Sequence, residues 1–173
     1  MSVRHTTRQM AMQVLFLWDV AGDMDRPQAE LAIREASDDS AARDRAIEMA
    51  AAAWLIRGDT DQWLERLAPQ WPPRRQPGVD RSILRLATWE LTKTQTPPIV
   101  TIDEAVELAK EFSTEQSSSF VNGVLDALLH EIQNTSAMPT SIDVSGPAIA
   151  PPLASVPSPV ATSAQPPATS EPT

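Results

Sequence analysis

Residues 101–112 read TIDEAVELAKEF, and residues 117–132 read SSSFVNGVLDALLHEI. In the first segment apolar side chains recur at intervals of three and four residues, which places them on one side of an α-helix. Thr101 and Glu104 match the S/T-x-x-E capping box, so we expect the helix to begin there and Glu104 to face water. The second segment keeps the same period and predicts another helix. Two amphipathic helices in succession indicate a helical domain.

The same helical period extends toward the N-terminus, whereas strand signals are nearly absent. We therefore expect an all-α fold of about seven helices arranged as two small bundles packed together. The sequence PQWPPRRQPG at residues 69–78 cannot continue a helix and predicts a boundary between halves at about 1–68 and 79–133. The expected helices cover, approximately, residues 7–20, 27–37, 40–57, 60–67, 80–94, 101–112 and 117–132, with Thr60 capping the fourth.

Residues 134–173 have a different composition. This segment holds nine of the 16 prolines and contains no Lys, Arg or aromatic residue. Its Ser, Thr and Ala side chains offer too little apolar area to offset the backbone ordering entropy of about 1–2 kcal/mol per residue. We expect a disordered tail.

The composition excludes several classes of chemistry. The chain has no Cys, two His and five Gly, and no glycine-rich phosphate-binding spacing. We therefore expect no catalytic residues, no metal site and no cofactor. No apolar run reaches the roughly 18 residues that a membrane span needs, so we expect a soluble cytoplasmic protein.

Charge is unevenly distributed along a chain whose net charge is -9. Residues 1–20 carry +1 and residues 69–95 carry +3, whereas residues 21–68 carry -5 and residues 96–133 carry -6. Arginine supplies planar donors for phosphate. The two basic segments are compatible with modest RNA binding, although such residues also serve solubility alone.

Four segments point to a known family: RQMAMQVLF at residues 8–16, SILRLATWEL at 82–91, IDEAVELAKEF at 102–112 and SSSFVNGVLD at 117–126. Together they resemble the NusB family of transcription antitermination proteins. The resemblance implies the NusB-like helical fold and a non-catalytic role in antitermination. It also implies binding to the boxA element of nascent ribosomal RNA together with NusE, a small-subunit ribosomal protein, within the RNA polymerase antitermination complex.

The resemblance further implies site residues. Those for single-stranded boxA RNA are Arg4, His5, Arg8, Gln13, Gln116, Ser117, Ser119 and Phe120, with Phe16 one helix turn after Gln13. Those for the NusE face are Asp80, Arg81 and Arg85. Two structural alternatives stand beside these roles: Phe120 packs between helices, and Arg85 forms a buried pair with Glu90.

Two other functions are compatible with the sequence. The chain also resembles the N-terminal RNA-binding region of an RNA cytosine-5 methyltransferase, which would make it a stand-alone RNA-binding module associated with RNA methylation. The net acidity instead favours a protein-only helical scaffold. The sequence leaves open whether the chain forms a homodimer.

Overall fold

The computed structural model describes residues 3–136, and the side chains of residues 5–135, of the 173-residue chain. This part of the chain is all-α, as predicted, with seven α-helices and one short 3-10 turn. The helices are α1 Val3–Ala21, α2 Arg26–Ala32, α3 Ser40–Leu55, α4 Arg57–Leu67, α5 Gly78–Lys93, α6 Pro98–Phe112 and α7 Ser117–Ser136, and the turn η1 is Pro73–Arg75.

Helix α1 packs against α3, and α2 covers one end of this pair. The apolar residues of α1 that the sequence places on one face, including Val14, Leu15 and Trp18, are at most 1% exposed. The alanines of α3 allow the two helices to approach closely, and Trp18 meets Trp54 edge to face with 6.2 Å between ring centroids. Gly22 ends α1 with a φ of +84°, a left-handed conformation that favours glycine.

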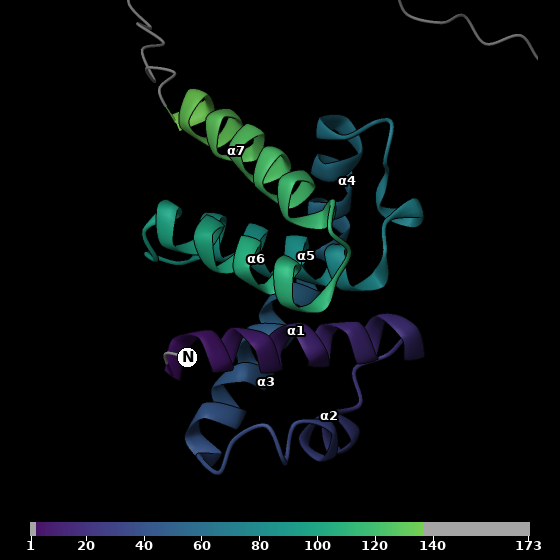
Figure 1. The fold of residues 1–173 in the computed structure, drawn as a ribbon, viewed down its shortest axis with the longest axis vertical. Coiled ribbons are helices and arrows are strands. Elements are labelled where there is room, and N and C mark those ends of the chain that lie inside the picture. The colour runs from purple at the N-terminus through teal and green to yellow at the C-terminus, as the bar shows by residue number, and fades with distance from the viewer. Residues whose placement is uncertain (1–2, 137–173) are drawn as a thin grey trace, which may run out of the picture. The chain divides into compact units, whose positions relative to one another are not determined.

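Helix α5 occupies the centre of the fold, because α1, α3, α4, α6 and α7 all pack against it. Figure 1 shows α2 and the start of α3 on one side of α1 and the α5–α7 group on the other, while the rest of α3 crosses α1 and packs against α5. Leu84 of α5, Leu108 of α6 and Leu125 of α7 are almost completely buried where these helices meet. The central position explains why α5 is buried around most of its circumference, including charged residues.

Helix α4 precedes the proline-rich linker in the sequence but packs against α5 and α7, which follow the linker. An exposed ion pair of 2.7 Å between Arg66 of α4 and Glu131 of α7 lies on this contact. The contacts therefore group α4 with the helices that follow it. A separation into halves at 1–68 and 79–133 stays a prediction.

Several local expectations are wrong. Helix α6 begins at Pro98, so Thr101 lies inside the helix, where its side chain forms no cap, and Glu104 is only 22% exposed because it binds His5. Helix α4 begins at Arg57, before Thr60, which is buried and does not cap it. Both errors have the same cause: each helix begins three residues before the expected cap, so the threonine lies inside the helix and is buried by neighbouring helices.

The end of α7 also differs from the prediction. The helix extends through residues 134–136, which the composition assigns to the tail. The rest of the predicted tail, residues 137–173, lies outside the described residues. Among residues 3–136, no helix combines the length and the apolar character needed to cross a bilayer.

Candidate nucleic-acid interface

The predicted basic motif lies on the first turns of α1, where two of its side chains are buried. Arg8 is 7% exposed, and its Nε donates to both carboxylate oxygens of Glu90, at 3.1 and 3.0 Å. Glu90 lies on α5 and is itself 4% exposed. The Arg8 guanidinium is thus neutralised within the fold and joins α1 to α5. It also lines a hollow of about 470 Å³ beside Arg45.

His5 makes a second connection between α1 and the later helices. Its Nδ1 lies 2.8 Å from Oε2 of Glu104, and its Nε2 lies 3.6 Å from Oε1 of Glu111. Both carboxylates belong to α6. The ring therefore fixes the start of α1 against α6. Arg4 precedes it in the same helix, outside the residues whose side chains are described.

One and two turns further along α1, the side chains become more accessible. Gln13 is half-buried, and Phe16 is 40% exposed. Phe16 lies over Gly78, the first residue of α5: a Cβ atom at that position would lie 2.8 Å from Cε2 of the Phe16 ring. Glycine therefore permits the ring to rest against the beginning of α5.

The second predicted segment forms the start of α7. Gln116 and Ser119 are exposed, Phe120 is half-buried, and Ser117 is buried. The Ser117 hydroxyl donates to Oδ2 of Asp80 at 2.8 Å, which ties α7 to the start of α5. Ser117 thus positions this segment from inside the fold. Gln116, Ser117, Phe120 and Asp80 share a pocket of about 300 Å³ with Trp71.

The three residues predicted for the NusE face have different environments. Asp80 is 2% exposed and Arg85 is 6% exposed, whereas the Arg81 side chain is 20% exposed. The alternative pairing of Arg85 with Glu90 is wrong, because Glu90 binds Arg8. Arg85 instead forms two hydrogen bonds with Asp61, at 2.9 and 2.7 Å, and one with Asp19, at 2.6 Å.

Asp19 is the centre of this ion-pair network. It accepts from Arg85 and also from Arg81, whose Nε lies 3.0 Å away. Burial alone would raise the pKa of Asp19, but the hydrogen bonds and charges of the two arginines outweigh it and hold the pKa below the ordinary value. Burial alone would likewise lower the pKa of Arg85, and its two carboxylate partners raise it instead. The network holds α1, α4 and α5 together.

Sequence reasoning missed Trp71, which is 41% exposed in the linker between α4 and α5. The guanidinium of Arg75 lies 5.2 Å from the centre of its indole ring. The sequence contains a signal, since an aromatic residue is followed within four positions by two arginines in PQWPPRRQPG. The prolines of this segment predict a break between helices, and that prediction says nothing about which side chains reach the surface.

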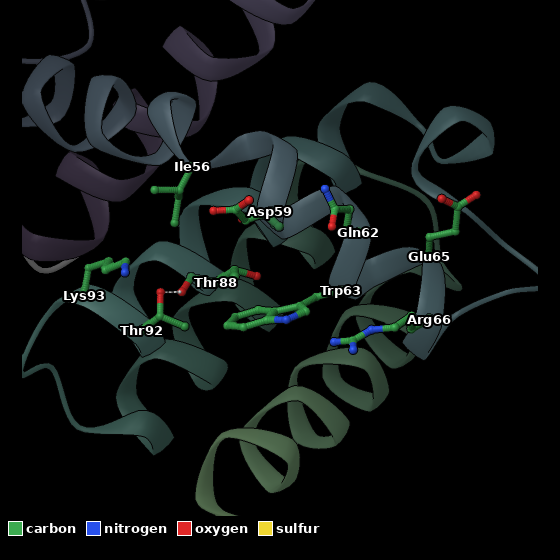
Figure 2. Close-up of a pocket in the computed structure, with 10 residues that line it drawn as sticks. Ile56, Asp59, Gln62, Trp63, Glu65, Arg66, Thr88, Thr92 and Lys93 are labelled. Atoms are coloured by element: carbon green, nitrogen blue, oxygen red, sulfur yellow. Dashed lines mark hydrogen bonds between the residues drawn. The ribbon is translucent and has the colours of Figure 1, made fainter. Parts of the chain in front are cut away.

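A larger hollow, of about 590 Å³, lies between α4 and α5 (Figure 2). Asp59 and Glu65 line it together with Arg66 and Lys93, so its charges balance and do not favour a polyanion. The predicted site residues do not line it. Within residues 3–136, no group of three or more His, Cys, Asp or Glu side chains is arranged to hold a metal ion.

Comparisons with known proteins agree with this architecture. The model of the NusB family matches residues 5–130. A transcription antitermination protein NusB from Solibacter usitatus is 40% identical over 149 residues, covering 83% of this chain and 99% of that protein.

Solved structures of NusB proteins have the same fold. The T. maritima NusB structure superposes with a TM-score of 0.63 at 35% identity, covering 74% of this chain and 91% of the other. A structure of the antitermination factors NusB and NusE in complex with dsRNA contains a chain that is 27% identical, with a TM-score of 0.66 and coverage of 76% and 98%. The chain therefore belongs to the NusB family.

Proposed function

We propose that this protein is a transcription antitermination factor that binds boxA-type RNA together with the ribosomal protein NusE. The observation that carries the proposal is the match to NusB proteins over nearly their whole length, one of which was solved with NusE and dsRNA. The protein acts in this proposal as a non-catalytic adaptor without a cofactor. It works in the cytoplasm, where bacterial ribosomal RNA is transcribed.

The proposed RNA surface runs from the exposed side of α1 to the start of α7. Gln13, Phe16, Gln116, Ser119 and Phe120 supply its accessible polar and aromatic groups. Aromatic rings at such a surface stack on unpaired bases, and hydroxyl and amide groups bind phosphate and base edges. Arg4 precedes this surface on α1 and remains a proposed phosphate contact.

The buried members of the predicted RNA site have a positioning role in this proposal. His5 and Arg8 fix the start of α1 against α6 and α5, and Ser117 fixes the start of α7 against Asp80. The two halves of the RNA surface therefore keep a constant spacing. Such preorganisation lowers the entropy lost on binding.

The proposed NusE face includes Asp80, Arg81 and Arg85 at the start of α5. Arg81 is the most accessible of the three and is the one we expect to touch NusE directly. Its guanidinium also donates to the carbonyl oxygen of Pro73 at 2.7 Å, so it links the network to the linker. Arg85 and Asp80 support this face from within the fold.

Electrophoretic mobility shift with labelled boxA RNA tests the proposal directly. We expect binding to strengthen when NusE is added and to weaken with salt, with a log-log slope of about -0.7 for each phosphate contact on single-stranded RNA. A duplex of the same sequence should compete poorly if the RNA is read as a single strand. Absence of any NusE-enhanced shift at low salt contradicts the proposal.

A charge introduced at the surface locates the RNA. Ser119→Glu places a carboxylate on the exposed start of α7 and should weaken binding several-fold by repelling phosphate. Ala41→Glu adds the same charge near the start of α3, on the opposite side of α1 (Figure 1), and serves as the control. Equal RNA affinities of the two variants would contradict the place of α7 in the RNA surface.

The alternative function, a protein-only scaffold, predicts a protein partner whose recovery from cells does not change when RNase is added.

A further inference from the structure

The linker between α4 and α5 presents an aromatic surface with a cation over it. Trp71 is 41% exposed, and Arg75 lies over its ring. Covering an exposed indole is favourable, and its flat ring offers a stacking surface to an aromatic ligand. Arg74 is also exposed but forms an ion pair of 2.7 Å with Glu65, so Arg75 is the linker cation that has no carboxylate partner within the described residues. Residues 68–79 themselves contain no acidic residue, although the whole chain carries -9. The linker therefore favours an aromatic, anionic ligand.

The pocket beside Trp71 has the size and the walls for such a ligand. It measures about 300 Å³, and Phe120 and Gln116 from the start of α7 line it together with Trp71. Rings from two distant parts of the sequence thus border one hollow. Stacking of a nucleobase on an aromatic ring does not depend on the identity of the base, because every base has a π-face.

Asp80 adds an acceptor that the protein leaves unmatched. It is 2% exposed and lines the same pocket. Its Oδ2 accepts from Ser117, whereas its Oδ1 has no hydrogen-bond partner within the described part of the chain. Burial of an unmatched acceptor is unfavourable. Carboxylates accept hydrogen bonds from the N4 amino group of cytosine, so a bound base with such a group offers the donor that Asp80 lacks.

On the basis of the RNA-binding function proposed for this protein, we propose that this pocket holds one unpaired nucleobase that carries an exocyclic amino group. Trp71 stacks on the base, Arg75 neutralises the adjoining phosphate, and Asp80 selects the amino group. The pocket lies next to Gln116 and Phe120, so it extends the RNA surface from α7 onto the linker. The linker adds Arg75, an exposed cation, to this surface.

Abasic scanning of the RNA tests the stacking role. Each nucleotide of boxA RNA is replaced in turn by an abasic site, and affinities are measured for the full-length wild type and for Trp71→Ala. We expect one position at which removal of the base lowers the RNA affinity of the wild type about tenfold. At that position the affinity of Trp71→Ala should not fall further, because this variant already lacks the contact. Trp71→Phe should retain most of the wild-type pattern, since a phenyl ring also stacks.

Charge and surface controls accompany this measurement. Arg75→Gln should weaken RNA binding and reduce the salt slope by about 0.7, the contribution of one phosphate. Arg34→Gln removes the same charge from an exposed site after α2 and should change neither. Leu55→Ala removes a side chain that is 75% exposed at the end of α3 and controls for loss of surface apolar area. Thermal unfolding checks that each variant is folded.

Base substitution at the coupled position tests the role of Asp80. Wild type should prefer cytidine over uridine there, because only cytosine offers an amino donor at this edge. Asp80→Asn can keep the bond from Ser117 through its carbonyl oxygen and turn its own amide donor toward the pocket. The preference should then disappear or reverse in favour of uridine.

Two outcomes would overturn the pocket assignment and leave the general function intact. The first is that wild type binds boxA RNA but no abasic position is coupled to Trp71. The second is that Trp71→Ala weakens NusE binding in the absence of RNA while RNA affinity is unchanged, which would assign the pocket to the protein partner. Failure of the wild type to bind RNA at all would instead contradict the proposed function itself.

Discussion

At the start of α1 the guanidinium of Arg8 is buried against Glu90, whereas in the linker before α5 the guanidinium of Arg75 lies over an exposed indole. Both residues belong to segments that are locally basic in an acidic chain. The first segment uses Arg8 to hold helices together, whereas the second buries Arg85 in the same way and leaves Arg75 at the surface. Local charge in a sequence thus identifies where cations occur, while burial determines what they can bind.

Loss of the buried Arg8–Glu90 pair should lower folding stability more than any of the other changes considered below. Arg8→Ala should lower the free energy of unfolding by about 3–5 kcal/mol, because Glu90 would remain buried without its cation. Chemical denaturation measures the change. The double variant Arg8→Met with Glu90→Leu removes both charges and should recover most of the loss. A loss below 1 kcal/mol for Arg8→Ala would mean that the pair does not carry the contact between α1 and α5.

The network around Asp19 should produce the next largest effect, and it depends on pH. Asp19→Asn should cost about 1.5–3 kcal/mol at neutral pH, the range for hydrogen bonds to charged groups. The pKa of Asp19 lies below its ordinary value of 3.8, so its stabilising effect is complete above that pH and is lost as the pH falls through the folded-state pKa. The difference in stability between wild type and Asp19→Asn should therefore be constant above about pH 5 and shrink in acid. A difference that grows toward low pH would contradict this sign.

A smaller effect is expected where Phe16 rests on α5. Gly78→Ala places a methyl group 2.8 Å from the Phe16 ring, which is too close for van der Waals contact. The ring must therefore shift, and its 40% exposure gives it room to do so. We expect a change in stability of about 1 kcal/mol or less, since the ring shifts at the surface and alanine favours the helix. If Phe16 stacks on a base, the free energy of RNA binding should change more than the free energy of unfolding. Crystals of the variant would show the direction of the shift.

The smallest effect is expected for an exposed ion pair. Arg26 and Glu30 are four residues apart in α2, with side chains 52% and 53% exposed. Glu30→Gln should change the free energy of unfolding by about 0.5 kcal/mol or less, because solvent screens the pair. Both Glu30→Gln and Arg8→Ala remove one charge of an ion pair, but only the Arg8 pair is buried. The difference between their unfolding free energies therefore reports the effect of burial. A loss comparable to that of Arg8→Ala would invalidate the comparison.

The fold could be predicted from the sequence because its signals are local. Apolar spacing in Ala11, Val14, Leu15 and Trp18 identifies the buried face of α1, and all four side chains are at most 1% exposed. Helical period alone fixes such a face. The prolines of residues 69–78 also mark the linker correctly, since proline cannot continue a helix.

The roles of polar residues could not be predicted in the same way, because they depend on partners distant in sequence. Arg8 and Glu90 are separated by 82 residues, and His5 and Glu104 by 99. A local pattern such as the capping box at Thr101 and Glu104 therefore predicts a partner nearby in the sequence, whereas Glu104 binds His5. The exposure of Gln116 and Ser119 agrees with a surface role, but RNA contact at these residues stays a prediction.

The distance along the chain between His5 and Glu104 has a consequence for biosynthesis. At the roughly 5–20 residues per second of translation, α6 is made on the order of 5–20 seconds after the first turn of α1. During that interval the N-terminal imidazole and guanidinium have no carboxylate from the later helices to meet them. The first turn of α1 can therefore reach its final position only after α5 and α6 have been made, so its docking is a late step that follows synthesis of residue 104.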